Sequence, residues 1–225
     1  MGERVRLQAA DGHRFSGYRA RPKGKAAGAL VVIQEIFGLN DHIRAVCDRF
    51  AAAGFLTVSP ALFDRIERDA EFGYTEEATA RGRALRAELG WDKPLLDIGA
   101  AMLDAARAGP VGVAGFCWGG SLAWLAATRL DASCAVCYYG AQIIDFVAER
   151  PRCPVMIHFG TKDALIPVET RDKIRAAHPE AEIHTYPADH GFNCDARAAF
   201  DPENAALAWE RTLAFLRTHA GAKTV

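Results

Sequence analysis

The sequence lacks a strong net charge, any long apolar run and the paired cysteine spacing of a disulfide framework. Its 27 basic and 28 acidic side chains leave a formal charge of -1, so there is no basic excess to hold phosphate groups. We therefore expect neither nucleic acid nor an anionic membrane as the main partner. Apolar residues make up 50% of the chain, which excludes a disordered or collagen-like protein. A small neutral or modestly charged ligand fits this composition better.

No segment approaches the roughly 18 consecutive apolar residues that a membrane-spanning helix needs. Residues 1–13 also lack the apolar core of a secretory signal, so we expect a cytoplasmic protein. The sequence leaves both a monomer and a homodimer open.

The six cysteines are predicted to be free thiols, because a chain of 225 residues can fold without disulfides. Cys134 and Cys137 form a C-x-x-C motif inside the apolar run ASCAVCYYG. A strand at this position directs the two side chains to opposite faces, which disfavours a metal or redox role for the pair.

Strand-like apolar runs alternate with helical patterns along the chain. This alternation is typical of an α/β fold, in which a mostly parallel sheet is covered by helices on both faces. Strands are predicted at residues 28–36, 55–62, 111–116, 134–140, 154–160 and 182–187. Helices are predicted around residues 43–50, 96–108, 121–130, 171–177 and 202–219, and the charged segment 64–90 is predicted to be loop plus helix.

The beginning of the chain breaks this alternation. Asp11-Gly12 suits a tight turn between two short strands, which predicts an antiparallel edge hairpin over residues 5–20. No internal repeat and no linker rich in proline or glycine divides the chain. We therefore predict a single domain over residues 1–225.

The run Gly115-Phe116-Cys117-Trp118-Gly119-Gly120 lies where a predicted strand gives way to a helix. It has the G-x-nucleophile-x-G form, in which a sharp turn raises the central side chain and glycines leave room for close packing. The helix N-terminus favours a thiolate at Cys117, and the Trp118 amide is free to bind an oxyanion. A buried structural cysteine or a phosphate-binding turn are the alternatives.

Two later loops supply partners for this cysteine. Asp163 follows the strand predicted at residues 154–160, and His190 follows the strand predicted at residues 182–187. The order nucleophile, acid, histidine is the one this fold uses for a catalytic triad, with His190 as the base and Asp163 orienting it. Asp172 and Asp189 are weaker candidates for the acid. His158 lies within an apolar strand and is predicted to be a core residue, and the other histidines are predicted at the surface or at helix ends, namely His13, His42, His178, His184 and His219.

With these motifs in order, the chain resembles the dienelactone hydrolase family of the α/β-hydrolase superfamily. The resemblance is carried by IQEIFGLN, GFCWGG, GTKD and DHGF, and it runs from about residue 5 to residue 216. It implies cleavage of an ester or enol lactone through a thiol acyl-enzyme, with no metal and no organic cofactor. It also implies that Glu35 holds the resting Cys117 thiol by a hydrogen bond, and that the Ile36 amide joins that of Trp118 in the oxyanion hole. From the residues alone, Glu35 could instead pair with a structural arginine.

Substrate recognition is where the chain departs from its family. Relatives that cleave dienelactone typically carry an arginine four residues after the catalytic histidine, and Cys194 occupies that position here. Arg81, Arg83 and Arg197 are the candidate substrate ligands, with Arg86 in the same charged segment as the first two. The predicted reaction is hydrolysis of a lactone or small activated ester, since a thiol nucleophile requires a good leaving group. The alternatives are a general carboxylesterase or thioesterase, a hydrolase fold that only binds its ligand, and a thiol redox sensor.

Overall fold

The computed structural model describes residues 2–221, and its centre is one eight-stranded sheet. The strand order is β1-β2-β4-β3-β5-β6-β7-β8, in which β1 and β2 run antiparallel to their neighbours and the other strands are parallel. The strands are β1 (Glu3–Gln8), β2 (Arg14–Ala20), β3 (Gly28–Ile33), β4 (Phe55–Pro60), β5 (Val111–Phe116), β6 (Cys134–Tyr138), β7 (Val155–Gly160) and β8 (Glu182–Tyr186). The mostly parallel sheet and its antiparallel edge hairpin are therefore confirmed.

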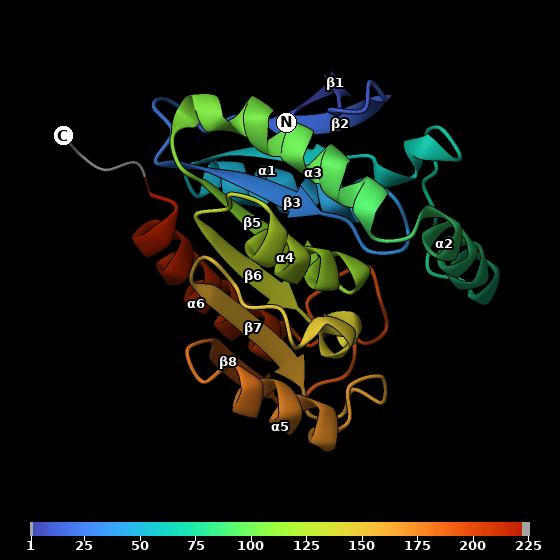
Figure 1. Cartoon of the computed structure of the whole chain (residues 1–225), viewed down its shortest axis with the longest axis vertical. Helices are drawn as coiled ribbons and strands as arrows, with labels where there is room; N and C mark the ends of the chain where they lie inside the picture. Colours follow the sequence, from blue (N-terminus) through green and yellow to red (C-terminus); the bar gives the residue numbers. More distant parts are fainter. Residues whose placement is uncertain (1, 222–225) are drawn as a thin grey trace.

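Helices cover both faces of the sheet, as the alternating pattern predicts. Figure 1 shows α3 and α4 in front of the sheet and α1 and α6 behind it. The α-helices are α1 (Asp41–Ala52), α2 (Glu76–Leu89), α3 (Asp92–Ala105), α4 (Trp118–Arg129), α5 (Val168–Ala177) and α6 (Pro202–His219). Short 3-10 helices span η1 (Leu62–Arg65), η2 (Ala106–Ala108) and η3 (Ala141–Phe146). No helix within residues 2–221 is both long enough and apolar enough to cross a membrane.

Burial explains why the central strands have continuous apolar runs. Every residue of β3, β4, β5, β6 and β7 is buried, because helices pack on both faces of these strands. The outermost strands differ: β1 and β8 each have exposed residues. The carboxyl ends of the parallel strands point toward the side of the molecule where α2 lies (Figure 1), so the loops that follow them meet there.

Several predicted boundaries are wrong by a few residues. The hairpin connection is longer than a tight turn, since β1 ends at Gln8 and β2 begins at Arg14. Helix α3 begins at Asp92 rather than at residue 96, because Pro94 lies in the first turn, where a missing N–H costs no hydrogen bond. Helix α4 begins at Trp118 rather than at residue 121, directly after Cys117. The first parallel strand ends at Ile33, which leaves Glu35 in a loop.

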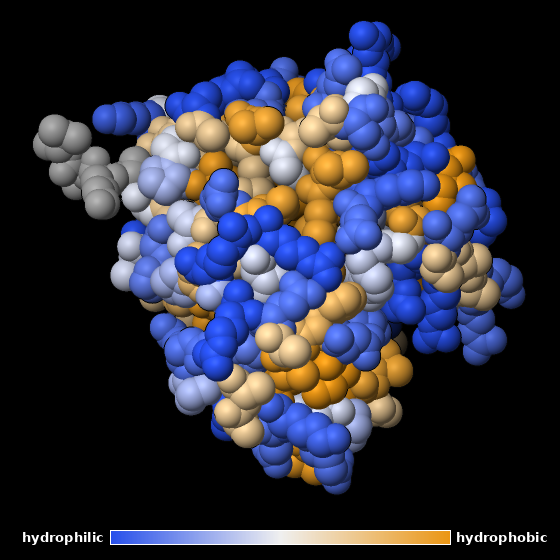
Figure 2. Space-filling view, in the orientation of Figure 1, coloured by the Kyte–Doolittle hydropathy of each residue, from blue (hydrophilic) through white to orange (hydrophobic). Residues whose placement is uncertain are grey.

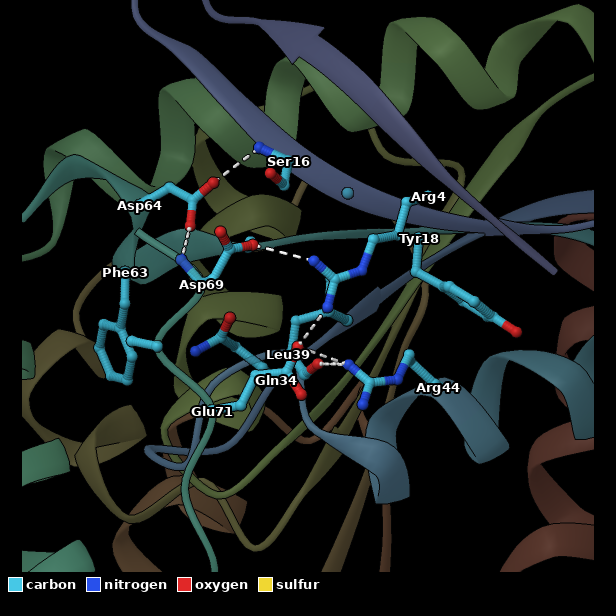
Figure 3. Close-up of a pocket in the computed structure, with 13 residues that line it drawn as sticks. Arg4, Ser16, Tyr18, Gln34, Leu39, Arg44, Phe63, Asp64, Asp69 and Glu71 are labelled. Carbon is cyan, nitrogen blue, oxygen red and sulfur yellow. Dashed lines mark hydrogen bonds and ion pairs between the residues drawn. The ribbon is translucent and has the colours of Figure 1, made fainter. Parts of the chain in front are cut away.

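The loop after β3 is held in place by the segment that precedes α2. Gly38 has a φ of 80° and forms a bridge with Glu71, and a Cβ at Gly38 would collide with the Ala70 carbonyl oxygen. Figure 3 shows the ion pairs around this contact. Arg4 bonds to Glu71 at 2.9 Å, and Arg44 of α1 bonds to the same carboxylate at 2.7 Å. This network ties β1 and α1 to the segment, and so fixes the loop that carries Glu35 and Ile36.

An apolar surface lies over α3, on the face shown in Figure 2. Leu96 and Leu103 of this helix are 38% and 80% exposed, beside a hollow of about 630 Å³. This hollow is lined by residues of β1, α3, η2, β5, α4 and the loops between them, and it includes none of the predicted catalytic residues.

Candidate active site

Cys117 lies on a sharp turn between β5 and α4. Its backbone has φ 56° and ψ -116°, a region that non-glycine residues rarely occupy and that persists only where the surrounding structure enforces it. A Cβ at Gly115 would collide with the Gly119 carbonyl, and a Cβ at Gly119 would collide with the carbonyl oxygens of Ile33 and Gln34. The two glycines flanking the cysteine therefore allow β3, β5 and α4 to approach closely enough to form the elbow.

Cys117, His190 and Asp163 form one hydrogen-bonded line. His190 Nε2 lies 3.1 Å from Cys117 Sγ, and His190 Nδ1 lies 2.7 Å from Asp163 Oδ2. The second oxygen of Asp163 accepts a hydrogen bond from the Leu165 amide at 2.8 Å, which fixes the carboxylate. The structure thus brings together three residues that are far apart in the sequence. Of the weaker candidates, Asp172 lies on α5 and pairs with Arg175.

The surroundings of His190 favour its protonated form. Burial by itself lowers the pKa of this imidazole, but the charge of Cys117 and the hydrogen bonds to Asp163 and Cys117 together raise the pKa to about 10. The ring also packs edge-on against Tyr139, with the centroids 5.0 Å apart. The raised pKa favours transfer of the Cys117 thiol proton to the imidazole, which can return a proton in a later step.

The two residues expected to supply amides for an oxyanion are both close to Cys117 in the fold, since Trp118 directly follows it and Ile36 lines its pocket. Trp118 begins α4, where the first amides of a helix have no acceptor within the helix. Ile36 lines the same pocket as Cys117 and His190. The Trp118 ring is fully buried and stacks on Phe63 at 5.4 Å, which anchors the start of the helix.

The pocket in front of Cys117 has a volume of about 80 Å³, which suits a compact substrate. Its lining includes two of the three catalytic candidates and residues of α2, η3 and the surrounding loops, namely Ile36, Phe37, Thr79, Arg83, Arg86, Cys117, Ala141, Gln142, Leu165, His190 and Arg197. The three arginines predicted to contact substrate are therefore separated: Arg83 and Arg197 line the pocket, but Arg81 does not. Arg81 is 54% exposed and forms an ion pair with Glu67 instead.

Glu35 has a different partner from the one that the family resemblance implies. Its Oε1 accepts a hydrogen bond from Arg197 Nη1 at 3.4 Å, whereas the Cys117 thiol bonds to His190. No hydrogen bond joins Glu35 to Cys117 among residues 2–221. The Arg197 guanidinium also lies over the rings of Phe37 and Tyr74, at 5.6 and 5.8 Å. In this state Glu35 is the buried partner of an arginine, the alternative that its residue type alone allows.

Two residues near the site were missed by the sequence analysis. Tyr139 has a φ of 39°, packs against His190 and has a buried hydroxyl that finds no partner in the described part of the chain. Its place after β6, at the carboxyl edge of the sheet, was a usable signal. His42 was predicted at the surface or a helix end; it lies in the first turn of α1 but is only 5% exposed. One ligand atom each of His42, Glu35 and Cys194 lie within 4.8 Å of one another, so these residues could hold a metal.

Other sequence expectations are met in the core. His158 is fully buried, and its two ring nitrogens bond to the hydroxyls of Tyr186 and Thr212 at 2.8 and 3.0 Å, so it is a core histidine as predicted. All six cysteines are free. Cys134 and Cys137 are both fully buried in β6, and burial raises the pKa of each, which makes a redox role for this pair a poor fit.

Comparisons with known proteins point to one family. The Dienelactone hydrolase family matches residues 15–220. A carboxymethylenebutenolidase homologue of Azospirillum brasilense is 38% identical, with 96% of this chain and 99% of the relative covered. Carboxymethylenebutenolidase 1 of Cupriavidus pinatubonensis is 33% identical, with 96% and 97% covered. The crystal structure of a dienelactone hydrolase homologue from Klebsiella pneumoniae is 32% identical, with a TM-score of 0.80 and coverage of 94% of this chain and 98% of that one.

Proposed function

We propose a specific reaction for this chain, which belongs to the dienelactone hydrolase family and has the α/β-hydrolase fold: hydrolysis of a lactone or small activated carboxylic ester through a thiol acyl-enzyme. The observation that carries the proposal is the line Asp163–His190–Cys117, with distances of 2.7 and 3.1 Å, at a strained elbow that opens into a small pocket. The full-length relatives named as carboxymethylenebutenolidases support a lactone as the substrate class.

The first half of the reaction transfers the acyl group to sulfur. His190 accepts the thiol proton of Cys117, and the sulfur attacks the carbonyl carbon of the substrate. The amides of Ile36 and Trp118 bind the oxyanion of the tetrahedral intermediate. The intermediate collapses to a thioester, and the alkoxide or enolate that leaves takes the proton from His190. In a lactone this leaving oxygen stays attached to the acyl group.

The second half regenerates the thiol. His190 takes a proton from a water molecule, the resulting hydroxide attacks the thioester carbon, and a second tetrahedral intermediate forms in the same oxyanion hole. Its collapse releases the carboxylic acid and returns the proton to the sulfur. Asp163 holds His190 in the required tautomer and stabilises the imidazolium in both halves.

Substrate charge separates this proposal from a general esterase or thioesterase. Arg83 and Arg86 of α2 line the pocket, and they are spaced so that both lie on one face of the helix. Arg197 also lines the pocket, but its charge is partly offset by Glu35. We expect Arg83 to bind a substrate carboxylate. The pairing of Arg197 with Glu35 is the observation that favours the alternative, a preference for neutral esters.

The test measures initial hydrolysis rates on a carboxylated enol lactone, its neutral ester analogue, an aryl acetate and an acyl thioester. We expect the wild type to turn over the carboxylated lactone best, and Cys117→Ala to lose at least about 10⁴-fold in kcat. Cys153→Ala is the matched control, since Cys153 is also partly exposed but lies away from the pocket.

Each outcome decides between the candidate functions. Full activity in Cys117→Ala would remove the acyl-enzyme mechanism. Faster turnover of the neutral esters would favour the general esterase, and Arg83→Met then leaves the rates unchanged. If no substrate is hydrolysed by the wild type, the chain is a member of the family that only binds its ligand.

A further inference from the structure

A second group of reactive side chains lies next to Arg197, which pairs with one of its members. Glu35 comes from the loop after β3, His42 from the first turn of α1 and Cys194 from the loop that follows His190. One ligand atom from each lies within 4.8 Å of the other two. The exposed fractions of these residues are 0%, 5% and 0%, so three separate segments of the chain bring a carboxylate, an imidazole and a thiol together away from solvent.

Two polar atoms of this cluster are left without partners. Glu35 Oε2 and His42 Nε2 are both buried, and neither makes a hydrogen bond in the described part of the chain. Buried polar atoms are nearly always paired, and an exception calls for an explanation such as an ion or a water molecule. The other atom of each group is already engaged: Glu35 Oε1 faces Arg197, and His42 Nδ1 lies 2.9 Å from Asp195 Oδ1. The unpaired atoms are therefore the ones free to bind an ion.

The donor set matches the chemistry of zinc. Zn²⁺ is bound by cysteine sulfur, histidine nitrogen and carboxylate oxygen, with bonds of about 2.0–2.3 Å. Ligand atoms around a tetrahedral ion at such distances are about 3.3–3.8 Å apart. The three ligand atoms already lie within 4.8 Å of one another, so small side-chain movements bring them to these separations.

His42 also has the hydrogen-bond partner that is usual for a metal-binding histidine. A histidine that binds a metal through one ring nitrogen usually donates from the other to a carboxylate, which fixes the ring and raises its basicity. Asp195 provides this carboxylate, and it is itself held by Arg49 at 3.2 Å. Asp195 directly follows Cys194 in the chain, so one loop supplies both a ligand and the group that orients another ligand.

We propose that Glu35, His42 and Cys194 form a binding site for a zinc-type divalent cation, with solvent or the neighbouring Tyr74 hydroxyl completing the coordination. Tyr74 Oη lies 3.3 Å from the Cys194 sulfur. Binding displaces the proton of the Cys194 thiol to solvent, and no electron transfer is involved. Arg197 opposes a cation at this place, but it contacts only one oxygen of Glu35, and the charges of Glu35, Asp195 and the Cys194 thiolate outnumber those of Arg197 and Arg49.

The test must separate this site from the catalytic pair, because Cys117 and His190 also offer a thiol and an imidazole. Metal-free, reduced Cys117→Ala protein is therefore titrated with Co²⁺ and followed by its sulfur-to-cobalt charge-transfer absorption. Equilibrium dialysis with Zn²⁺ gives the stoichiometry. We expect one ion per chain. Adding Cys194→Ala to this background removes the charge-transfer band, whereas adding Cys137→Ala, a buried cysteine outside the cluster, leaves it unchanged.

Two further substitutions keep the test informative if the loss of Cys194 disturbs folding. His42→Gln in the Cys117→Ala background weakens Zn²⁺ binding, and Asp195→Asn weakens it by about 10–100-fold, the usual loss for a group that orients a ligand. Far-UV circular dichroism of the metal-free variants checks that each is folded. Failure of the Cys117→Ala protein to take up Co²⁺ or Zn²⁺, or binding that survives both Cys194→Ala and His42→Gln, overturns the proposal. These readouts do not use turnover, so they stand whether or not the proposed hydrolysis is correct.

Discussion

Two clusters in this chain use the same three functional groups, a carboxylate, an imidazole and a thiol, and connect them differently. Asp163, His190 and Cys117 form a line in which each group bonds to the next, at 2.7 and 3.1 Å. The ligand atoms of Glu35, His42 and Cys194 converge within 4.8 Å of one another, and the first two have atoms without a partner. In the line, His190 exchanges a proton with Cys117 while Asp163 holds the imidazole, whereas a convergent set presents several lone pairs to one point.

Exposure adds to the contrast. Cys117 is partly exposed at the pocket, but Cys194 is fully buried. A nucleophile must reach a substrate, while a ligand is better protected from solvent. Geometry and burial therefore assign the two thiols to different chemistry, although residue type alone does not distinguish them.

After the loss of Cys117 itself, the largest expected effect comes from breaking the line at its carboxylate. Asp163→Asn keeps the shape of the side chain, and the backbone N–H of Leu165 can still donate to its oxygen. The uncharged asparagine side chain, however, no longer stabilises the His190 imidazolium. We expect kcat for the preferred ester to fall by about 10³–10⁴-fold. Steady-state kinetics with that ester measure the loss.

Asp172→Asn is the control for this substitution. Asp172 is 63% exposed and pairs with Arg175 on α5, so its loss is expected to leave kcat unchanged. A fall in kcat of less than tenfold in Asp163→Asn would mean that the Asp163 carboxylate does not assist proton transfer by His190.

A smaller effect, on stability, comes from the residue between the two clusters. Arg197 lines the pocket and is the only side chain of residues 2–221 that bonds to the Glu35 carboxylate. Because the Glu35 side chain is 1% exposed, Arg197→Met leaves an uncompensated buried charge. We expect the free energy of unfolding to fall by about 3 kcal/mol. Urea unfolding of metal-free protein measures it.

The double variant Arg197→Met with Glu35→Gln tests the cause of this loss. Removing the charge along with its partner should restore most of the stability. Arg175→Met is the matched control, because the exposed Arg175–Asp172 pair contributes about 0.5 kcal/mol or less. Equal stability of Arg197→Met and wild type would show that Glu35 finds another partner within the convergent cluster.

The sequence predicted the line and missed the convergent set, for a physical reason. The elbow GFCWGG, Asp163 and His190 each lie at or after the carboxyl end of a parallel strand, and these strand ends meet at one edge of the sheet. Strand order alone therefore placed these residues near one another. His42 lies in a helix turn and Cys194 in a loop, and their approach to Glu35 depends on loop packing that leaves no periodic signal.

The arginines of α2 show the same limit at the scale of one helix. Arg81 and Arg83 are both in a charged segment whose apolar pattern is weak, so the sequence does not fix which side of the helix faces the pocket. The structure turns Arg83 toward the pocket and leaves Arg81 bonded to Glu67. Substrate contacts that depend on helix rotation could not be predicted as well as the triad.

The smallest effect concerns the charge of His190 within the line. The pKa of this imidazole is raised to about 10 although burial alone lowers it, and the charge of Cys117 is the largest of the raising influences. Cys117→Ala should therefore lower the pKa of His190 by roughly one to three units. A pH titration of the His190 ring signals by NMR measures the shift, and Cys153→Ala is expected to leave them unchanged.

The sign of the accompanying stability change follows from the raised pKa. A folded-state pKa above the unfolded value of about 6.5 gives a contribution to stability that is fully present below that pH. The contribution is lost as the pH rises toward about 10, where the folded imidazole releases its proton. As the pH rises between these two values, the free energy of unfolding, measured with urea, should therefore fall more in the wild type than in Cys117→Ala. If the pKa of His190 is the same in Cys117→Ala as in the wild type, Asp163 alone sets the charge of the imidazole. His190 and Asp163 then form a pair that is electrostatically independent of the thiol.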